Sequence, residues 1–303
     1  VTLSLIDIKA DLLEALGKRF GGDREHPAVI HGRSLGCGPF TLLRCVERPG
    51  WHGDIGVGYT TYWANSLIAG WHVEGDTVPC VKSIEVRLTM LDAWMTRAYT
   101  AQRRDPEAFK GEAGQGFHAS ACFAESFEHR AETTGITLRS SQTIGFGTAD
   151  PAVTTINNRS SFMLCFDQPI TIEAAREELY RLQCLFSLLC GIQSHPTMIV
   201  LRPERENDLG LDRQAYLLSA YAYKDRESIR IAQQLLTHQT LIEPYLGHIW
   251  SSWQAGIDVY RVPVELHAST SVFGDQLTRF EFLSAAQALE VLHRRLRPSK
   301  ERV

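Results

Sequence analysis

The stretch Ser83–Met90, "SIEVRLTM", has the clearest β-strand pattern in the chain. Ile84, Val86, Leu88 and Met90 alternate with polar residues, so an extended backbone places the apolar side chains on one face. Such alternation is typical of an antiparallel sheet with one face buried and the other in water. The stretch therefore predicts a β-rich domain around it.

Short β-prone runs lie on both sides of this strand and are separated by Gly, Pro and Asp. Their spacing predicts an antiparallel, sandwich-like β domain. The charged, glycine-rich stretch Gln102–Gly116 is predicted to be an exposed loop. The other predicted strands are Ala28–Arg33, Phe40–Val46, Val57–Trp63, Ser66–Val73, His118–Glu125, Gly135–Phe146, Ser160–Phe166, Thr197–Arg202 and Ala215–Tyr223.

One amphipathic helix is predicted within this part of the chain, over Thr171–Cys190. Thr171 is a suitable N-cap, and Gly191 follows the helix at a position that needs a positive φ. The apolar residues at helical spacing predict a buried stripe that consists of Leu179, Leu182, Leu185, Phe186 and Leu189.

The apolar spacing changes near residue 232 from the period of a strand to that of a helix. Ile242, Leu246 and Trp250 recur on one side of a predicted helix. A second row beside them consists of Leu241, Tyr245, Ile249 and Trp253. We therefore predict an α+β chain, with a β-rich domain over residues 1–232 and the first helices of an incomplete helical bundle over residues 233–303.

The last predicted helix, Asp275–Arg297, includes "FEFLSAAQALEVLHRR" at Phe280–Arg295. Because one large apolar side chain in water forfeits about 1.5–3 kcal/mol, we expect further polypeptide, from the same chain or a second copy, to cover this helix. One apolar flank consists of Phe282, Ala285, Leu289, Leu292 and Leu296, and a second of Leu277, Phe280, Ala288 and Val291. A narrow polar strip of Arg279, Gln287, Glu290 and Arg294 remains.

The composition is that of an ordinary globular protein. Of the 303 residues, 44% are hydrophobic and 22% are charged. A chain of this length can bury two hydrophobic cores. A formal net charge of −4 gives no overall attraction to nucleic acid or anionic membranes, so any such contact would be a local patch. No apolar run reaches the length of about 18 residues that a membrane-spanning helix needs.

Neither a metal nor a cofactor is expected. The seven cysteines include no C-x-x-C pair, and we interpret them as reduced thiols of a cytoplasmic protein. Zinc sites require such close ligand pairs. The glycine-rich stretches Gly32–Gly38 and Gly53–Gly58 lack the Lys-Ser/Thr ending of a phosphate-binding loop.

Two further sites stay open as alternatives. A hydrolase would need paired carboxylates, for which Glu85, Glu125 and Glu128 are available. Four of the six tryptophans lie close together in the sequence and form either a ligand groove or part of a core. They are Trp51, Trp63, Trp71 and Trp94, of which the first three are our candidate ligand-binding residues.

Four segments resemble the N-terminal domain of ApeA-type abortive-infection proteins: Ile30–Gly36, Phe40–Cys45, Leu67–His72 and Leu88–Trp94. The later stretch "FLSAAQALEVLHRR" is similar to the first long helix of the HEPN domain that follows in those proteins. The resemblance implies bacterial anti-phage defence, in which a β-rich sensing module controls a metal-independent HEPN ribonuclease. It also implies a homodimer, an RNA substrate and a phage-derived trigger. No membrane is expected as a partner, because the apolar runs are too short to span one.

HEPN ribonucleases use an R-x(4–6)-H motif. The His exchanges a proton near neutral pH, and the Arg stabilises charge on the phosphate. Three pairs fit this spacing, about as many as chance gives. They are Arg19/His26, Arg24/His31 and Arg261/His267. The first two lie in the β-rich part, and Pro263 within the third is expected to interrupt a helix. We therefore expect the catalytic pair to lie beyond Val303.

Glu290 and His293 match the Glu and His of the family's LE-x-x-H pattern. The resemblance implies that they face the nuclease cleft, whereas ordinary helix-surface polarity is the simpler interpretation.

The alternative function of the protein is a non-enzymatic binding module. Its tryptophan-lined β surface would bind a carbohydrate, a peptide or a phage protein, and its helices would mediate assembly.

Overall fold

Hydrogen bonds join nine strands of the computed structural model in the order β1-β2-β5-β13-β12-β6-β11-β10-β9. The structure describes residues 29–35, 38–47, 52–54, 57–59, 62–95, 100–103, 118–121, 126–150, 153–203, 214–219, 235–270 and 279–296. With the helices given below, this arrangement confirms the α+β fold and its β-rich N-terminal part.

The nine strands are β1 (Val29–Ser34), β2 (Gly38–Glu47), β5 (Tyr62–Ala69), β6 (Val81–Leu88), β9 (Glu128–Ala131), β10 (Ile136–Asp150), β11 (Val153–Ile170), β12 (Pro196–Pro203) and β13 (Ala215–Ser219). Two smaller antiparallel pairs join β3 (His52–Asp54) to β4 (Val57–Tyr59) and β7 (Thr100–Arg103) to β8 (His118–Ala121). The helices are α2 (Leu91–Trp94), α3 (Ile172–Cys190), α4 (Gln239–Thr270) and α5 (Arg279–Leu296).

The chain divides into two compact units. The first comprises Val1–Lys82, Pro169–Glu173 and Ile199–Lys224, and the second comprises Ser83–Gln168, Ala174–Met198 and Asp225–Val303. Because the chain passes between the units several times, neither unit is a single stretch of sequence.

The core of the first unit lies on strands β2, β5 and β13. Their neighbouring residues Thr41, Ile68 and Leu217 are buried in register. The segment after β5 is held against this core by the Thr41 hydroxyl, which donates to the Trp71 carbonyl oxygen at 3.1 Å and accepts from the Val73 amide at 3.1 Å. A buried threonine thus satisfies backbone groups that a loop would otherwise leave unpaired.

Arg44 in β2 has a left-handed backbone, with φ of 53°, which is unusual for a residue other than Gly. Its guanidinium pairs with Asp76 at 2.9 Å and with Glu173 at 2.8 Å. These two hydrogen bonds raise the pKa of Arg44. The ion pairs connect the middle of β2 to the loop after β5 and to the first turn of α3 within the first unit.

In the second unit, β6 confirms the alternation read from the sequence. Ile84 and Val86 are fully buried, and Leu88 is nearly so. The strand ends at Leu88, earlier than predicted, because Met90 has φ of 70° and turns the chain into the short helix α2. The buried Trp94 at the end of α2 then packs edge-to-face on Phe162 of β11.

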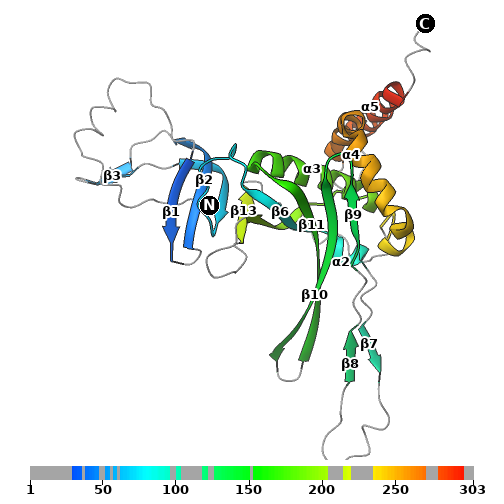
Figure 1. The fold of residues 1–303 in the computed structure, drawn as a ribbon, viewed down its shortest axis with the longest axis horizontal. Helices are drawn as coiled ribbons and strands as arrows, with labels where there is room; N and C mark the ends of the chain where they lie inside the picture. The colour runs from blue at the N-terminus through cyan, green and yellow to red at the C-terminus, as the bar shows by residue number, and fades with distance from the viewer. Residues whose placement is uncertain are drawn as a thin grey trace, which may run out of the picture. The chain divides into compact units, whose positions relative to one another are not determined.

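The strands β10 and β11 form a hairpin that is longer than predicted (Figure 1). Their register pairs Ile136 with Phe166 and continues to Gly147 opposite Thr155. The predicted strands Gly135–Phe146 and Ser160–Phe166 cover most of β10 but less than half of β11. The first residues of β11 include Thr and Asn, which do not alternate with apolar residues as a strand pattern requires, although their backbone pairs with β10.

Helix α3 matches its prediction closely. Gly191 follows it with φ of 71°, as expected for a glycine that ends a helix. The end of α3 also holds the segment that leads into α4: the Cys190 carbonyl accepts from the Leu236 amide at 2.9 Å, and the Leu189 carbonyl accepts from Thr237 Oγ1 at 2.7 Å. The indole of Trp94 donates to the same Thr237 hydroxyl at 3.2 Å.

Helix α4 corrects one expectation, because it continues through both Pro244 and Pro263. A proline removes one backbone hydrogen bond of the helix, but the helix is packed at this point, because Pro263 and Val264 are both buried. In the first half of α4, Trp250 is fully buried and its indole donates to the Ile136 carbonyl at 3.1 Å.

Helix α5 lies beside α4 (Figure 1). Ala288 is buried, whereas Leu283, Leu289 and Leu296 are 51%, 68% and 58% exposed. Leu289 and Leu296 belong to one apolar flank of α5, whereas Leu283 lies about 120–140° away around the helix axis. Apolar side chains are therefore exposed on two sides of α5 in this structure. Within the described part of the chain, no helix combines the length and the apolarity that crossing a membrane requires.

Candidate functional site

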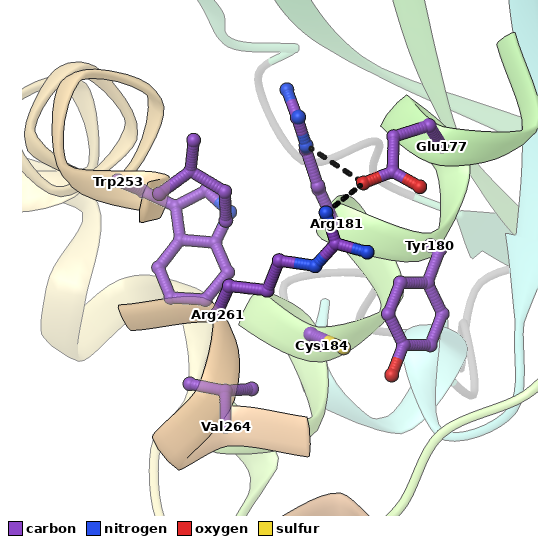
Figure 2. A pocket seen from close by; sticks show the side chains of 8 residues that line it. Glu177, Tyr180, Arg181, Cys184, Trp253, Arg261 and Val264 are labelled. Carbon is purple, nitrogen blue, oxygen red and sulfur yellow. Dashed lines mark ion pairs between the residues drawn. The ribbon is translucent and has the colours of Figure 1, made fainter. Parts of the chain in front are cut away.

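The second unit contains a small pocket between α3 and α4, seen in Figure 2. Its lining residues are Glu177, Tyr180, Arg181, Cys184, Trp253, Ile257, Arg261 and Val264. The hollow has space for roughly one water molecule. It is therefore too small, as it stands, to enclose an organic substrate.

Ion pairs cross this pocket from one helix to the other. Glu177 Oε1 lies 3.6 Å from Arg181 Nε and 3.5 Å from Arg261 Nη1. Figure 2 shows both guanidinium groups turned toward this carboxylate. Arg181 comes from the same helix as Glu177, one turn later, whereas Arg261 comes from α4.

A second carboxylate lies deeper beside the first. Arg181 Nη1 donates to Glu178 Oε1 at 2.6 Å, and Gln254 Nε2 donates to Glu178 Oε2 at 3.4 Å. Burial raises the pKa of Glu178, although Arg181 and Gln254 act in the opposite direction. The side chain of Arg261 is 52% exposed and that of Arg181 is 23% exposed, so Arg261 is the more accessible of the two cations.

Two donors at the pocket have no hydrogen-bond partner among the described residues. They are Trp253 Nε1 and Arg181 Nε, and both atoms are buried. The indole of Trp253 stacks on Tyr260 with ring centroids 6.0 Å apart, which fixes the ring. The pocket thus has unused hydrogen-bond donors beside two guanidinium groups, and this chemistry suits an oxyanion rather than a cation.

The structure places Arg261 in this cluster. His267 lies six positions later on the same helix α4, a spacing that fits the motif. The side chain of His267 lies outside the described residues. Arg19, Arg24 and His26 also lie outside them. The Nε2 of His31 donates to the Val73 carbonyl at 2.6 Å.

Glu290 and His293 lie three positions apart on α5 and are both exposed. Residues at this spacing are neighbours on a helix surface. Glu290 accepts a hydrogen bond from Arg294 at 2.5 Å. Their assignment to a nuclease cleft remains a prediction.

The tryptophans have different surroundings. Trp94 is only 1% exposed and belongs to the core, as the core-packing alternative predicts for this residue. Trp71 is half-buried in the loop after β5. Trp51 and the side chain of Trp63 lie outside the described residues, so ligand binding by Trp51, Trp63 and Trp71 remains a prediction.

The carboxylates considered for a hydrolase have other partners. Glu85 accepts a hydrogen bond from Ser161 at 3.0 Å, and Glu128 pairs with Arg139 at 2.9 Å. Glu125 lies outside the described residues.

Burial raises the pKa of Cys190 to about 12 and that of Cys80 to about 11, so both thiols are protonated at neutral pH. No group of three or more His, Cys, Asp or Glu side chains suitable for a metal occurs in the described ranges.

Sequence reasoning missed the pocket between α3 and α4. The spacing of Glu177, Glu178 and Arg181 is a signal that could have indicated ion pairs along α3, but nothing in it indicates a partner from α4. The sequence analysis considered Arg261 only as a member of the Arg261/His267 pair, and set it aside because Pro263 was misinterpreted as a helix breaker.

The comparison with known families explains the four motifs of the β-rich part. The family described as ApeA N-terminal domain 1 matches residues 3–253. No curated protein and no solved structure matches the chain. The matched range extends from before β1 into α4 and covers most of the 303 residues. The chain therefore belongs to the ApeA N-terminal domain family.

Proposed function

We propose that this chain is the infection-sensing part of an abortive-infection protein and controls a HEPN ribonuclease in the cytoplasm. Family membership places the chain in the context of anti-phage defence. The observation that carries the proposal is the family match over residues 3–253, followed by a helix with the LE-x-x-H pattern of a HEPN domain.

The surface of α5 supports a role near a ribonuclease cleft. Glu290 and His293 are exposed on neighbouring turns, and Arg294 and Arg295 follow in the last turn. A histidine can transfer protons near neutral pH, and arginines can hold phosphate groups. In the proposal these residues support an Arg/His pair that lies beyond Val303 in a homodimer, and RNA is the substrate.

The exposed leucines of α5 also support this arrangement. Leu289 and Leu296 leave one apolar flank in solvent, and burying each of them would contribute about 1.5–3 kcal/mol. In the proposal, later helices of the HEPN domain or a second copy of the chain cover this flank.

The test uses the complete gene product in bacteria challenged with phage. Exchange of His293 for Ala is expected to reduce infection-induced RNA cleavage, by less than the roughly 10²-fold typical of a residue that itself transfers the proton, because His293 supports the Arg/His pair in the proposal. Exchange of the exposed Gln287 for Ala on the same helix serves as the matched control. Full RNA cleavage by the His293→Ala protein, together with normal protection, would contradict this supporting role.

The sensing part of the proposal rests on Trp51, Trp63 and Trp71, which would bind a phage-derived trigger. Trp71 is the member whose surroundings are described: its carbonyl oxygen is fixed by Thr41, while the residue is half-buried. A Trp71→Ala protein is expected to lose the response to phage but to keep the ribonuclease activity when the trigger is bypassed by overproduction. Loss of both properties would indicate a folding defect rather than a lost sensor.

A non-enzymatic binding module is the alternative, and the same tryptophans favour it. It predicts that phage protection persists without RNA cleavage and depends on Trp71 but not on His293. Measurement of total RNA integrity after infection, for both variants, separates the two functions.

A further inference from the structure

We propose that the pocket between α3 and α4 binds a phosphate monoester, which takes the position of the Glu177 carboxylate. This carboxylate is an oxyanion held by guanidinium groups from two helices. The Glu177 Oε1 atom lies within 3.6 Å of Arg181 Nε and within 3.5 Å of Arg261 Nη1. Guanidinium groups recognise carboxylates and phosphates with the same planar set of donors.

A phosphate monoester would satisfy more of these donors than Glu177 does. It carries up to two negative charges and three terminal oxygens, whereas a carboxylate carries one charge and two oxygens. A buried donor without a hydrogen-bond partner is unfavourable, because it loses its water and gains nothing in exchange. Trp253 Nε1 is such a donor in the lining of this pocket, and in the proposal one of the additional oxygens accepts from it.

The dimensions of the pocket define the class of ligand. With space for roughly one water molecule, only the phosphoryl group can enter, and it can do so only if the Glu177 side chain swings out. Glu177 is 37% exposed, so its carboxylate can move into solvent.

The mouth of the pocket indicates what the rest of the ligand is. Arg261 is 52% exposed and Tyr180 is 38% exposed, and both belong to the pocket lining. An aromatic ring beside a cation suits a nucleoside, because a base can stack on the ring. A phosphodiester inside a nucleic-acid strand carries a nucleotide on each side of the phosphate, and both nucleotides would have to approach this narrow opening. The geometry therefore favours a nucleoside monophosphate.

The experiment measures binding to the full chain by calorimetry at constant ionic strength. The probes are uridine 5′-monophosphate, inorganic phosphate, uridine, and a short RNA without a terminal phosphate. We expect the first two to bind and the last two not to bind. Exchange of Glu177 for Gln is expected to tighten binding of the monophosphate by about tenfold, because it removes the competing charge.

Arg261→Gln is expected to weaken the binding by about tenfold. The matched control is Arg130→Gln, since Arg130 is 49% exposed and paired with Asp167 at 2.7 Å on a different element of the same unit. It is expected to bind as the unaltered chain does. An unchanged urea midpoint shows that each variant is folded, and Arg261→Lys, which keeps the charge but loses the planar donors, provides a second test.

Equal effects of Arg261→Gln and Arg130→Gln on the monophosphate would overturn the proposal, as would binding of uridine without its phosphate. Preference for the RNA without a terminal phosphate would show that the pocket reads a phosphodiester, and it too would overturn the proposal. These outcomes do not depend on phage protection or RNA cleavage.

Discussion

Helices α3 and α5 are both amphipathic and nearly equal in length, at 19 and 18 residues, yet they are buried differently. Leu182 and Phe186 of α3 are each 1% exposed, whereas Leu289 and Leu296 of α5 are 68% and 58% exposed. The rings of Trp94 and Phe162 pack on Phe186 of α3, while the described neighbour of α5 is α4. The apolar pattern thus predicts that a segment is helical and which of its faces are apolar. It does not predict how many of these faces pack against another element.

The largest expected difference comes from the same substitution in both helices. Leu182→Ala should lower the free energy of unfolding by about 2–5 kcal/mol, because it leaves a cavity in the core. Leu289→Ala should change it by less than about 0.5 kcal/mol, as is usual for exposed positions. Urea unfolding of the 303-residue chain measures both.

The same pair of variants also tests the proposed cover of α5. In the complete gene product, a cost of more than about 1 kcal/mol for Leu289→Ala would show that another surface buries this leucine. A negligible cost there as well would contradict the cover that we propose for α5.

A smaller effect is expected at the end of α3. Gly191 has φ of 71°, and a Cβ atom there would lie 2.9 Å from the Leu236 Cβ. Gly191→Ala should therefore destabilise the chain by about 1–2 kcal/mol from the backbone conformation alone, and by more from the close contact. Gly75→Ala is the control, because a Cβ atom at Gly75 meets nothing within 4 Å. Equal urea midpoints for the two variants would contradict the cap at Gly191.

The smallest expected effect is a pH dependence in the packing of α4 on β9. Burial lowers the pKa of His129, although Glu243 raises it in part. The unfolded chain then binds a proton at this residue more readily than the folded chain, so stability present above the ordinary pKa of about 6.5 declines as pH falls below it. Urea midpoints at pH 7.5 and pH 5.5 should differ less in His129→Gln than in the unaltered chain. His195 contributes in the same direction, since burial also lowers its pKa.

The sequence predicted the features that depend on neighbouring residues along the chain. The alternation around Ile84 and Val86, the stripe with Leu182 and the glycine at position 191 each reflect local geometry. The α3 and α4 pocket could not be predicted in this way, because Glu177 and Arg261 meet only after the chain has folded. Pro263 was misinterpreted for a related reason, since the packing that compensates for the lost hydrogen bond is not visible in a local pattern.

The short segment that leads into α4, residues 236–239, is expected to tolerate few insertions or deletions in related sequences. Thr237 is anchored to α3 and to Trp94, and α4 begins two residues later. Adding or deleting one residue in this segment would turn the whole of α4 by about 100° and carry the indole of Trp250 away from its acceptor on β10. Gaps in alignments of related chains should therefore avoid positions 236–239, and so should the breakpoints of chimeric or split versions of this protein.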